Sequence, residues 1–307
     1  MNPLTVLFFI AMFLDDYLFR QGKYLKMYLY SILFYCIFYY FNNRSTFHSY
    51  TKKYNMAAFS QSFDSTVYAR VKYNLKTVRK FLEEYWKKCG KKVSLTAFWI
   101  KVVGEVYKVV PEANESIRFG LKGTRKSVDI GVLVNVHNKD LANLTIRNVP
   151  GKTLEEIYDE LKEEGDVFRR EKNKEYNKSK GVLKLIPSFL ISICLEVTGI
   201  LSAAGFHIPS IGLNRNHFGS VLLSYVGSYG LKNVYGPLCP FTQTSGVFTV
   251  CALETKHEIN KEGKVEESEY LPVNFTLDHR YVDGMLSTKM VKKSKELFAD
   301  PKSFDVI

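Results

Sequence analysis

Apolar and polar positions from residue 65 onward fall into runs with the periods of strands and helices. Alternation over 65–73 predicts a strand, and apolar residues at three- and four-residue spacing predict helices over 75–89 and 96–110. Gly90 and Pro111 follow the last periodic residues and are suited to end these two helices. The first part of this region therefore reads as one strand followed by two amphipathic helices.

The middle of the chain adds a strand pair and a third helix. Two strand-like runs, over 128–136 and 141–149, flank a short polar turn. Thr153 and Glu156 have the spacing of a capping box ahead of an apolar periodic run, so we expect a helix to begin there. Residues 168–180 are strongly charged and are expected to be the exposed end of that helix and a loop.

The C-terminal third continues the mixture of strands and helices. Expected here, in chain order, are a strand over 220–225, a Gly-rich turn at 227–230, a strand over 246–254, a charged hairpin over 256–269, a strand over 271–278 and a helix over 286–298. The whole pattern indicates one α/β domain in which helices and a sheet form two layers, an α+β two-layer sandwich.

Residues 182–213 interrupt this domain with a largely apolar insert. Two interpretations stay open: a buried hairpin of helices, and a surface that leans on a membrane or binds a partner. Glu196 near the centre argues against a simple membrane span, because an ionised carboxylate in hydrocarbon is costly.

Residues 1–44 form a hydrophobic extension ahead of the domain at 45–307. The apolar run at 4–14 is too short to cross a hydrocarbon layer of roughly 30 Å. Residues 24–41 are rich in aromatic and aliphatic side chains with lysines at one end, which suits one short or tilted span. The alternatives are a cleaved mitochondrial presequence, which the Asp15-Asp16 pair argues against, and an aromatic helix packed on a partner protein.

The net charge of the chain limits the classes of partner that are expected. The chain has 43 Lys and Arg against 31 Asp and Glu, a net charge of +12 that suits an anionic partner such as nucleic acid, a lipid surface or a phosphorylated cofactor, although mitochondrial and membrane-facing proteins are often basic in any case. No nucleic-acid motif accompanies the charge, so nucleic acid is not an expected partner.

The chain has five cysteines, Cys36, Cys89, Cys194, Cys239 and Cys251. Because no two of them form a Cys-x-x-Cys pair, neither a metal site nor a disulfide is indicated. Such cysteines fit a reducing compartment.

His279 is the candidate for proton transfer. It follows the strand predicted over 271–278 and precedes the last helix, and a histidine at a strand end is suited to acid–base work at neutral pH. Asp283 is expected to pin the loop by pairing with a basic residue. On its own, one histidine with one aspartate is a weak signal that favours a structural histidine.

Several segments favour a catalytic histidine over a structural one, because they occur together and in the order in which they occur in a known family. They are Phe275-Thr-Leu-Asp-His-Arg-Tyr-Val-Asp-Gly284, Glu296-Leu-Phe-Ala-Asp-Pro301, the strand and Gly-rich turn over 218–230, Val109-Val-Pro-Glu-Ala-Asn114 and Ser127-Val-Asp-Ile-Gly131. Across residues 45–305 the chain resembles the acyltransferase catalytic domain of 2-oxoacid dehydrogenase complexes, whose motif is His-Arg-x-x-Asp-Gly and to which chloramphenicol acetyltransferase is related.

The resemblance implies a chloramphenicol acetyltransferase-like fold, a mixed sheet with helices on one face, assembled as a homotrimer with each active site at a subunit interface. In the family's catalytic set, His279 would deprotonate a thiol or hydroxyl, and Ser224 from the neighbouring subunit would stabilise the oxyanion. Asp283 would hold the loop without moving protons. Ser220 and Ser228 are nearby rivals for the role of Ser224.

Two histidines near the expected site, His137 and His217, are interpreted as packing or hydrogen-bonding residues and not as ligands. The resemblance also implies that coenzyme A is the acyl-carrying substrate. We expect a free-standing member of the family, with neither a lipoyl domain nor a subunit-binding domain, no bound lipoyl group and no metal.

The leading hypothesis is an acyltransferase that moves an acyl group between coenzyme A and an unidentified thiol or hydroxyl acceptor. The main rival is a catalytically inactive subunit that kept the fold and serves a membrane or mitochondrial assembly. It is favoured by the apolar segments and by residues 135–144, which replace the family's Asn-Gly-Leu-x-x-Pro stretch. A third hypothesis is a core whose lipoyl domain comes from another polypeptide. For a eukaryotic source we expect a mitochondrial, membrane-associated protein.

Overall fold

The structure is a computed structural model of the 307-residue chain. It describes residues 65–118, 121–136, 140–170, 188–203, 206–208, 215–259 and 263–303, together with residues 29, 30, 32–34 and 37. Most of the predicted N-terminal extension therefore lies outside the described residues, and so does His137. Within the described ranges, no helix has both the length and the apolar character needed to cross a membrane.

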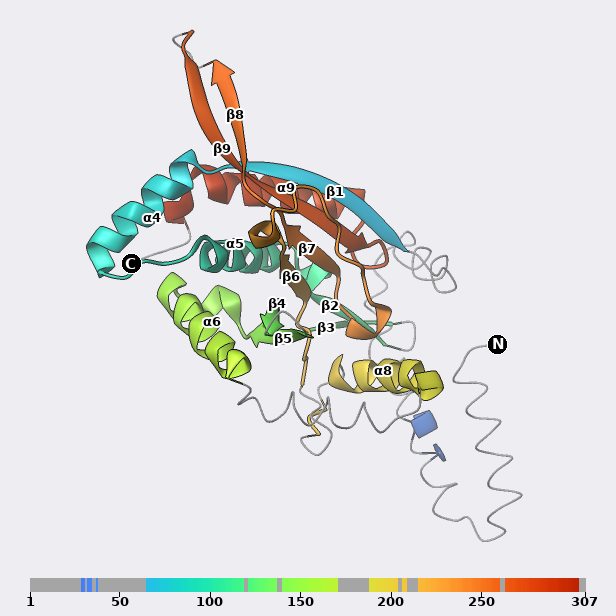
Figure 1. Ribbon diagram of the computed structural model, residues 1–307. Helices are drawn as coiled ribbons and strands as arrows, with labels where there is room; N and C mark the ends of the chain where they lie inside the picture. The colour runs from blue at the N-terminus through green and yellow to red at the C-terminus, as the bar shows by residue number, and fades with distance from the viewer. Residues whose placement is uncertain are drawn as a thin grey trace, which may run out of the picture.

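A mixed sheet forms the centre of the domain (Figure 1). Its strands lie in the order β1-β9-β7-β6-β4-β5, and β8 pairs only with the outer part of β9. The strands are β1 (Thr66–Asn74), β4 (Ile130–Val136), β5 (Asp140–Ile146), β6 (Val221–Tyr225), β7 (Gly246–Val250), β8 (Glu254–Ile259) and β9 (Val265–Asp278). β4, β6 and β7 run parallel, whereas β9 runs antiparallel to each of its partners, β1, β7 and β8.

Helices α4 (Lys76–Cys89), α5 (Leu95–Val109), α6 (Leu154–Arg169) and α9 (Gly284–Ala299) pack together against this sheet (Figure 1). An aromatic cluster joins the layers: the Phe298 ring stacks on Tyr73 of β1 with centroids 4.4 Å apart and meets Phe98 and Trp99 of α5 edge-on. All four side chains are buried, so this cluster is a large part of the hydrophobic core. The predicted α/β two-layer fold is confirmed.

Local signals set the helix ends as expected. Gly90 ends α4 in the left-handed region with φ of 68°, and its N–H donates to the carbonyl of Trp86. Both hydrogen bonds of the Thr153 and Glu156 capping box are present at the start of α6. The sequence reading missed Ser94, whose hydroxyl caps α5 by accepting from the N–H of Ala97.

Two expectations about strand boundaries are wrong, and one small sheet was not expected. β7 ends at Val250, and the chain resumes strand pairing only at Glu254, where the expected single strand breaks in two. The charged hairpin expected over 256–269 is present, with β8 as its first arm, but its second arm and the strand expected after it form one continuous strand, β9. The outer half of β9 pairs with β8 and its inner half with β1 and β7. A small sheet of β2 (Glu115–Arg118) and β3 (Leu121–Thr124) was not foreseen.

The apolar insert contains helix α8 (Ser188–Ala203), which lies away from the other helices in Figure 1. One side of α8 packs on the 3-10 turn at Pro240–Thr242, where a Cβ on Gly199 would come within 1.9 Å of the Phe241 carbonyl oxygen. The opposite side exposes Ile193, Val197 and Ile200. The described part of the insert is thus a single helix with an exposed apolar side, and not a fully buried hairpin.

We expect Phe298→Ala to lower the free energy of unfolding by about 3–5 kcal/mol, because it removes a ring from the junction of α9, α5 and β1. Urea unfolding followed by circular dichroism measures the change. Met285→Ala in the same helix is the control: its side chain is 71% exposed and its replacement should cost no more than about 0.5 kcal/mol. Equal losses in the two variants would contradict this core.

Candidate active site at the end of strand β9

His279 lies immediately beyond the last residue of β9 and is half-buried. Its backbone N–H donates to the carbonyl of Ser65, which continues the pairing of β9 with β1 by one residue. The sheet therefore places the histidine backbone, and the loop beyond it only has to orient the ring.

The ring is oriented by a hydrogen bond between Nδ1 and the carbonyl oxygen of Val282, at 3.2 Å. A carbonyl can only accept, so Nδ1 carries the proton in this arrangement. A neutral imidazole then has its lone pair on Nε2, which is the form a general base needs. The geometry thus prepares His279 to take a proton through Nε2.

Asp278 and Arg280 form an ion pair on either side of His279. The Asp278 carboxylate is 2% exposed and accepts from Arg280 Nη2 at 2.6 Å, from the Arg280 backbone N–H at 2.9 Å and from the Ser65 hydroxyl at 3.0 Å. A buried carboxylate needs such partners, because an unpaired charge there would be strongly destabilising. These bonds fold the chain tightly just after the strand.

Tyr281 fastens the other side of the loop to the small β2–β3 sheet. Its hydroxyl accepts from the N–H of Ile117 at 3.1 Å and donates to Gln243 Oε1 at 3.4 Å. The Gln243 carbonyl accepts from the buried guanidinium of Arg125. Burial raises the pKa of Tyr281 from 10.0 to about 12, so this hydroxyl stays protonated and can keep donating in moderately alkaline solution as well as at neutral pH.

Asp283 caps helix α9, which corrects the expectation that it pairs with a basic residue. Its carboxylate accepts from the N–H of Leu286 at 2.9 Å, and its backbone is extended as an N-cap requires. The ion pair that was expected of Asp283 is formed instead by Asp278, which is closer to the basic Arg280.

Ser224, the predicted oxyanion donor, lies near the C-terminal end of β6 and is half-buried. It pairs with Thr249 of β7, which pairs with Asn274 of β9, five residues before His279. At about 3.3 Å per residue along a strand and 4.8 Å between strands, Ser224 and His279 of one chain are on the order of 20 Å apart. They lie at opposite ends of the same sheet.

The two rival serines are placed differently. The hydroxyl of Ser220 is buried and donates to Asn114 Oδ1, which commits it to the core. Ser228 is exposed on a 3-10 turn after β6.

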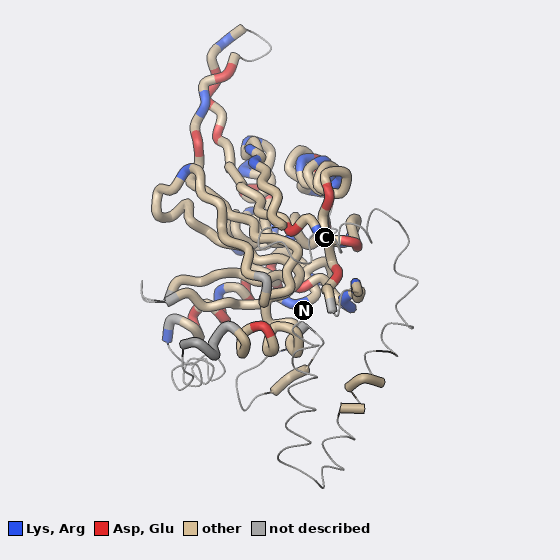
Figure 2. Tube along the Cα trace, turned by 90° about the vertical axis from the view of Figure 1, so that its right-hand side faces the viewer, with Lys and Arg blue, Asp and Glu red and all other residues tan. Residues whose placement is uncertain are grey.

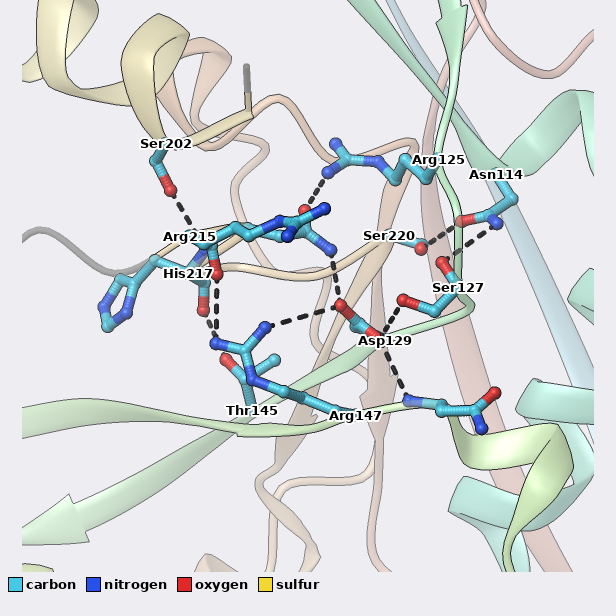
Figure 3. A network of polar contacts seen from close by, with 12 residues as sticks. Asn114, Arg125, Ser127, Asp129, Thr145, Arg147, Ser202, Arg215, His217 and Ser220 are labelled. Atoms are coloured by element: carbon cyan, nitrogen blue, oxygen red, sulfur yellow. Dashed lines mark hydrogen bonds and ion pairs between the residues drawn. The ribbon is translucent and has the colours of Figure 1, made fainter. Parts of the chain in front are cut away.

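A buried polar cluster around Asp129 lies at the same end of the sheet as the His279 loop (Figure 3). The Asp129 carboxylate accepts from the Ser127 hydroxyl at 2.8 Å, the Asn148 N–H at 2.9 Å and the Asn216 amide at 2.7 Å, and pairs with Arg147 at 3.7 Å. Asn216 also accepts from Arg125 and donates its N–H to the carbonyl of Ser202 in α8.

This cluster connects the insert to the candidate site. His217 belongs to it through its backbone, because its N–H donates to the Ser202 hydroxyl and its carbonyl accepts from Asn143. The His217 ring meets Phe218 edge-on, with centroids 4.7 Å apart. From α8, hydrogen bonds run through Asn216 and Arg125 to Gln243 and Tyr281.

Sequence reasoning missed Arg125, Gln243 and Tyr281. A lone arginine in a short polar stretch gives no periodic signal, and its burial depends on segments distant in sequence. Gln243 adopts a left-handed φ of 55°, which is uncommon for glutamine and could not be foreseen from its residue type. The tyrosine next to the histidine was a visible feature, but its partner Ile117 belongs to the unforeseen small sheet.

Comparison with family models gives one match, to the 2-oxoacid dehydrogenases acyltransferase (catalytic domain) family, over residues 49–183 and 213–305. The unmatched stretch between the two ranges falls within the apolar insert predicted at 182–213. A search of curated proteins finds no relative.

Solved structures support the fold. A probable dihydrolipoamide acetyltransferase from Listeria monocytogenes aligns with a TM-score of 0.57 at 15% identity, covering 80% of this chain and 88% of that one. The dihydrolipoamide acetyltransferase of Azotobacter vinelandii aligns with a TM-score of 0.57 at 16% identity, covering 81% and 87%. A truncated catalytic core from the 2-oxoacid dehydrogenase complex of Thermoplasma acidophilum gives 0.54 at 16%, covering 81% and 93%.

Burial of Tyr281 predicts a pH effect on stability. Because the folded-state pKa is raised from 10.0 to about 12, its contribution is complete below pH 10 and is lost as the pH rises toward 12. In that window we expect the unfolding free energy of the wild type to fall faster than that of Tyr281→Phe, by up to about 1.4 kcal/mol per pH unit. Urea unfolding at stepped pH measures both slopes. Parallel slopes would show that the hydroxyl is not buried.

The capping role of Asp283 predicts a difference between two substitutions. Asp283→Ala should cost about 1 kcal/mol of stability, whereas Asp283→Asn, which keeps an oxygen acceptor for the Leu286 N–H, should cost much less. Thermal and urea unfolding of both variants measure this. Equal losses would mean that the carboxylate charge, and so an ion pair, is what matters at this position.

Proposed function

The chain belongs to the 2-oxoacid dehydrogenases acyltransferase (catalytic domain) family, and from this premise we propose that it moves an acyl group between coenzyme A and a thiol or hydroxyl acceptor. The acceptor and the use of coenzyme A are part of the proposal. The observation that carries it is the held imidazole of His279, with Nδ1 on the Val282 carbonyl and Nε2 able to accept a proton.

In the forward direction, His279 Nε2 takes the proton from the acceptor thiol or hydroxyl as its sulfur or oxygen attacks the acyl carbon. The thioester carbonyl becomes a tetrahedral oxyanion. When this intermediate collapses, the carbon–sulfur bond to coenzyme A breaks and the leaving thiolate takes the proton back from the imidazolium. The products are the acylated acceptor and free coenzyme A, with no net change in protons or electrons.

Ser224 is proposed as the hydrogen-bond donor to the oxyanion, supplied by a second copy of the chain. A donor about 20 Å from the base within one chain cannot serve the same reacting carbon, because strand register fixes both positions. A closed homotrimer would bring the end of β6 in one subunit to the end of β9 in the next. Removing one such donor typically lowers turnover by about a hundredfold to a thousandfold.

The alternative, a subunit without catalysis that serves an assembly, rests on the exposed apolar side of α8. The two functions differ in one measurement. A scaffold would fold and assemble but would release no coenzyme A from acetyl, propionyl or longer acyl thioesters with small thiol and alcohol acceptors.

The test is complementation between two inactive variants. We expect His279→Ala and Ser224→Ala each to reduce coenzyme A release at least a hundredfold, with dihydrolipoamide as the thiol probe and chromatography as the readout. Chains of the two variants, refolded together in equal amounts, should regain about a quarter of wild-type activity, because in random trimers that fraction of interfaces joins an intact histidine to an intact serine.

Each variant refolded alone is the control and should stay inactive. An active wild type with no recovery in the mixture would contradict the shared site while leaving the acyltransferase activity standing. An inactive wild type with the expected fold and assembly would contradict the proposed activity itself.

A further inference from the structure

The positive charge of the chain is concentrated on two helices outside the candidate active site. Residues 76–92 and 284–302, which contain α4 and α9, hold twelve Lys and Arg against four Asp and Glu, a surplus of eight in a chain whose net charge is +12. Most of the net positive charge of the chain therefore lies in these two segments. A local surplus of this size creates a surface potential that attracts anions.

The two helices lie side by side, so their charges add. The chain just after α9 is tied to α4 by the ion pair of Lys302 with Glu84, at 2.8 Å. Figure 2 shows Lys and Arg positions gathered on neighbouring helices beside the sheet. We define the basic face as the exposed lysines of these helices that form no ion pair within the described residues: Lys80, Lys87, Lys88, Lys289, Lys292 and Lys295.

The residue type indicates the kind of partner. Eleven of the twelve basic residues are lysines, and the one arginine, Arg79, is held by Glu269 at 2.9 Å. Lysine is a flexible point charge, whereas bidentate recognition of a defined phosphate or carboxylate favours arginine. A set of mobile point charges suits a diffuse anionic surface better than a single shaped ligand.

An exposed tryptophan adds a second, independent feature. Trp86 of α4 is 48% exposed, and Lys92 Nζ lies 5.5 Å from the centroid of its ring. Tryptophan prefers the headgroup level of a bilayer, where its ring is apolar on its faces and its N–H meets water. Lysines with a tryptophan at the edge of an amphipathic helix are the composition of helices that lie on membranes.

We propose that the basic face, with Trp86 at its edge, docks on a membrane surface rich in anionic phospholipids. The lysines contact headgroup phosphates and carboxylates, and the Trp86 ring enters the headgroup layer. Binding does not depend on the acyl-transfer reaction or on an apolar membrane span. It is expected to weaken with salt, because the charges are exposed and screened.

The test uses the full chain and sedimentation with vesicles, either of phosphatidylcholine alone or with about a third of phosphatidylserine. We expect binding to the anionic vesicles only, weakened by high salt. Lys87→Gln/Lys289→Gln/Lys292→Gln should reduce the partition coefficient on the order of 100-fold, since each lysine near such a surface contributes about fivefold. Trp86→Ala should reduce it further and independently of salt.

The matched control is Lys126→Gln/Lys162→Gln/Lys232→Gln, which removes the same charge from exposed lysines on other segments and should change binding by no more than about threefold. Equal effects of the two triple variants would overturn the proposal, because net charge alone would then explain binding. So would equal binding to both kinds of vesicle. If the basic-face variant lost binding to a uridine homopolymer RNA but kept binding to anionic vesicles, the face would belong to nucleic acid and the proposal would fail.

Discussion

The antiparallel position of β9 between β1 and β7 is the constraint on which the candidate site depends. β9 is buried from Leu271 to Asp278, and its register with both neighbours fixes where it ends and where His279 begins. β6 runs parallel to β7 and therefore antiparallel to β9. Ser224, near the C-terminal end of β6, thus lies at the end of the sheet opposite to His279. No loop or side-chain movement can bridge the two ends of a hydrogen-bonded sheet. The proposed acyl transfer uses both residues, so in that proposal the active site is shared between chains and depends on their assembly.

Hydrogen bonds then turn the end of β9 into a defined loop. Asp278 bends the chain by pairing with Arg280, Tyr281 fastens it to the small sheet, and Asp283 starts α9. The histidine backbone is positioned by neighbours on both sides, and the hydrogen bond of Nδ1 with the Val282 carbonyl orients its ring. The bonds from Tyr281 through Gln243, Arg125 and Asn216 also reach the apolar insert. A continuous chain of buried and half-buried polar groups thus connects α8 to the loop.

The surface features lie on other elements. The basic face belongs to the outer sides of α4 and α9, and the exposed apolar residues belong to α8, whereas the loop of His279 is held by β1, β2 and β9. A docking role and a catalytic role therefore do not compete for the same side chains. The inner side of α9 packs Phe298 into the core, so its lysines are presented on a rigid support.

The sequence by itself determined the elements whose causes are local. Periodicity found α4, α5, α6 and α9, the Thr153 and Glu156 pair set the start of α6, and ordered motifs gave the family and singled out His279, Ser224 and Asp283. Only the tertiary structure decided what depends on residues far apart in the chain. These include the single long β9, the β2–β3 sheet, the capping role of Asp283, and the burial of Arg125 and Tyr281. The physical reason is that strand pairing and the satisfaction of buried polar groups need partners that no window of sequence contains.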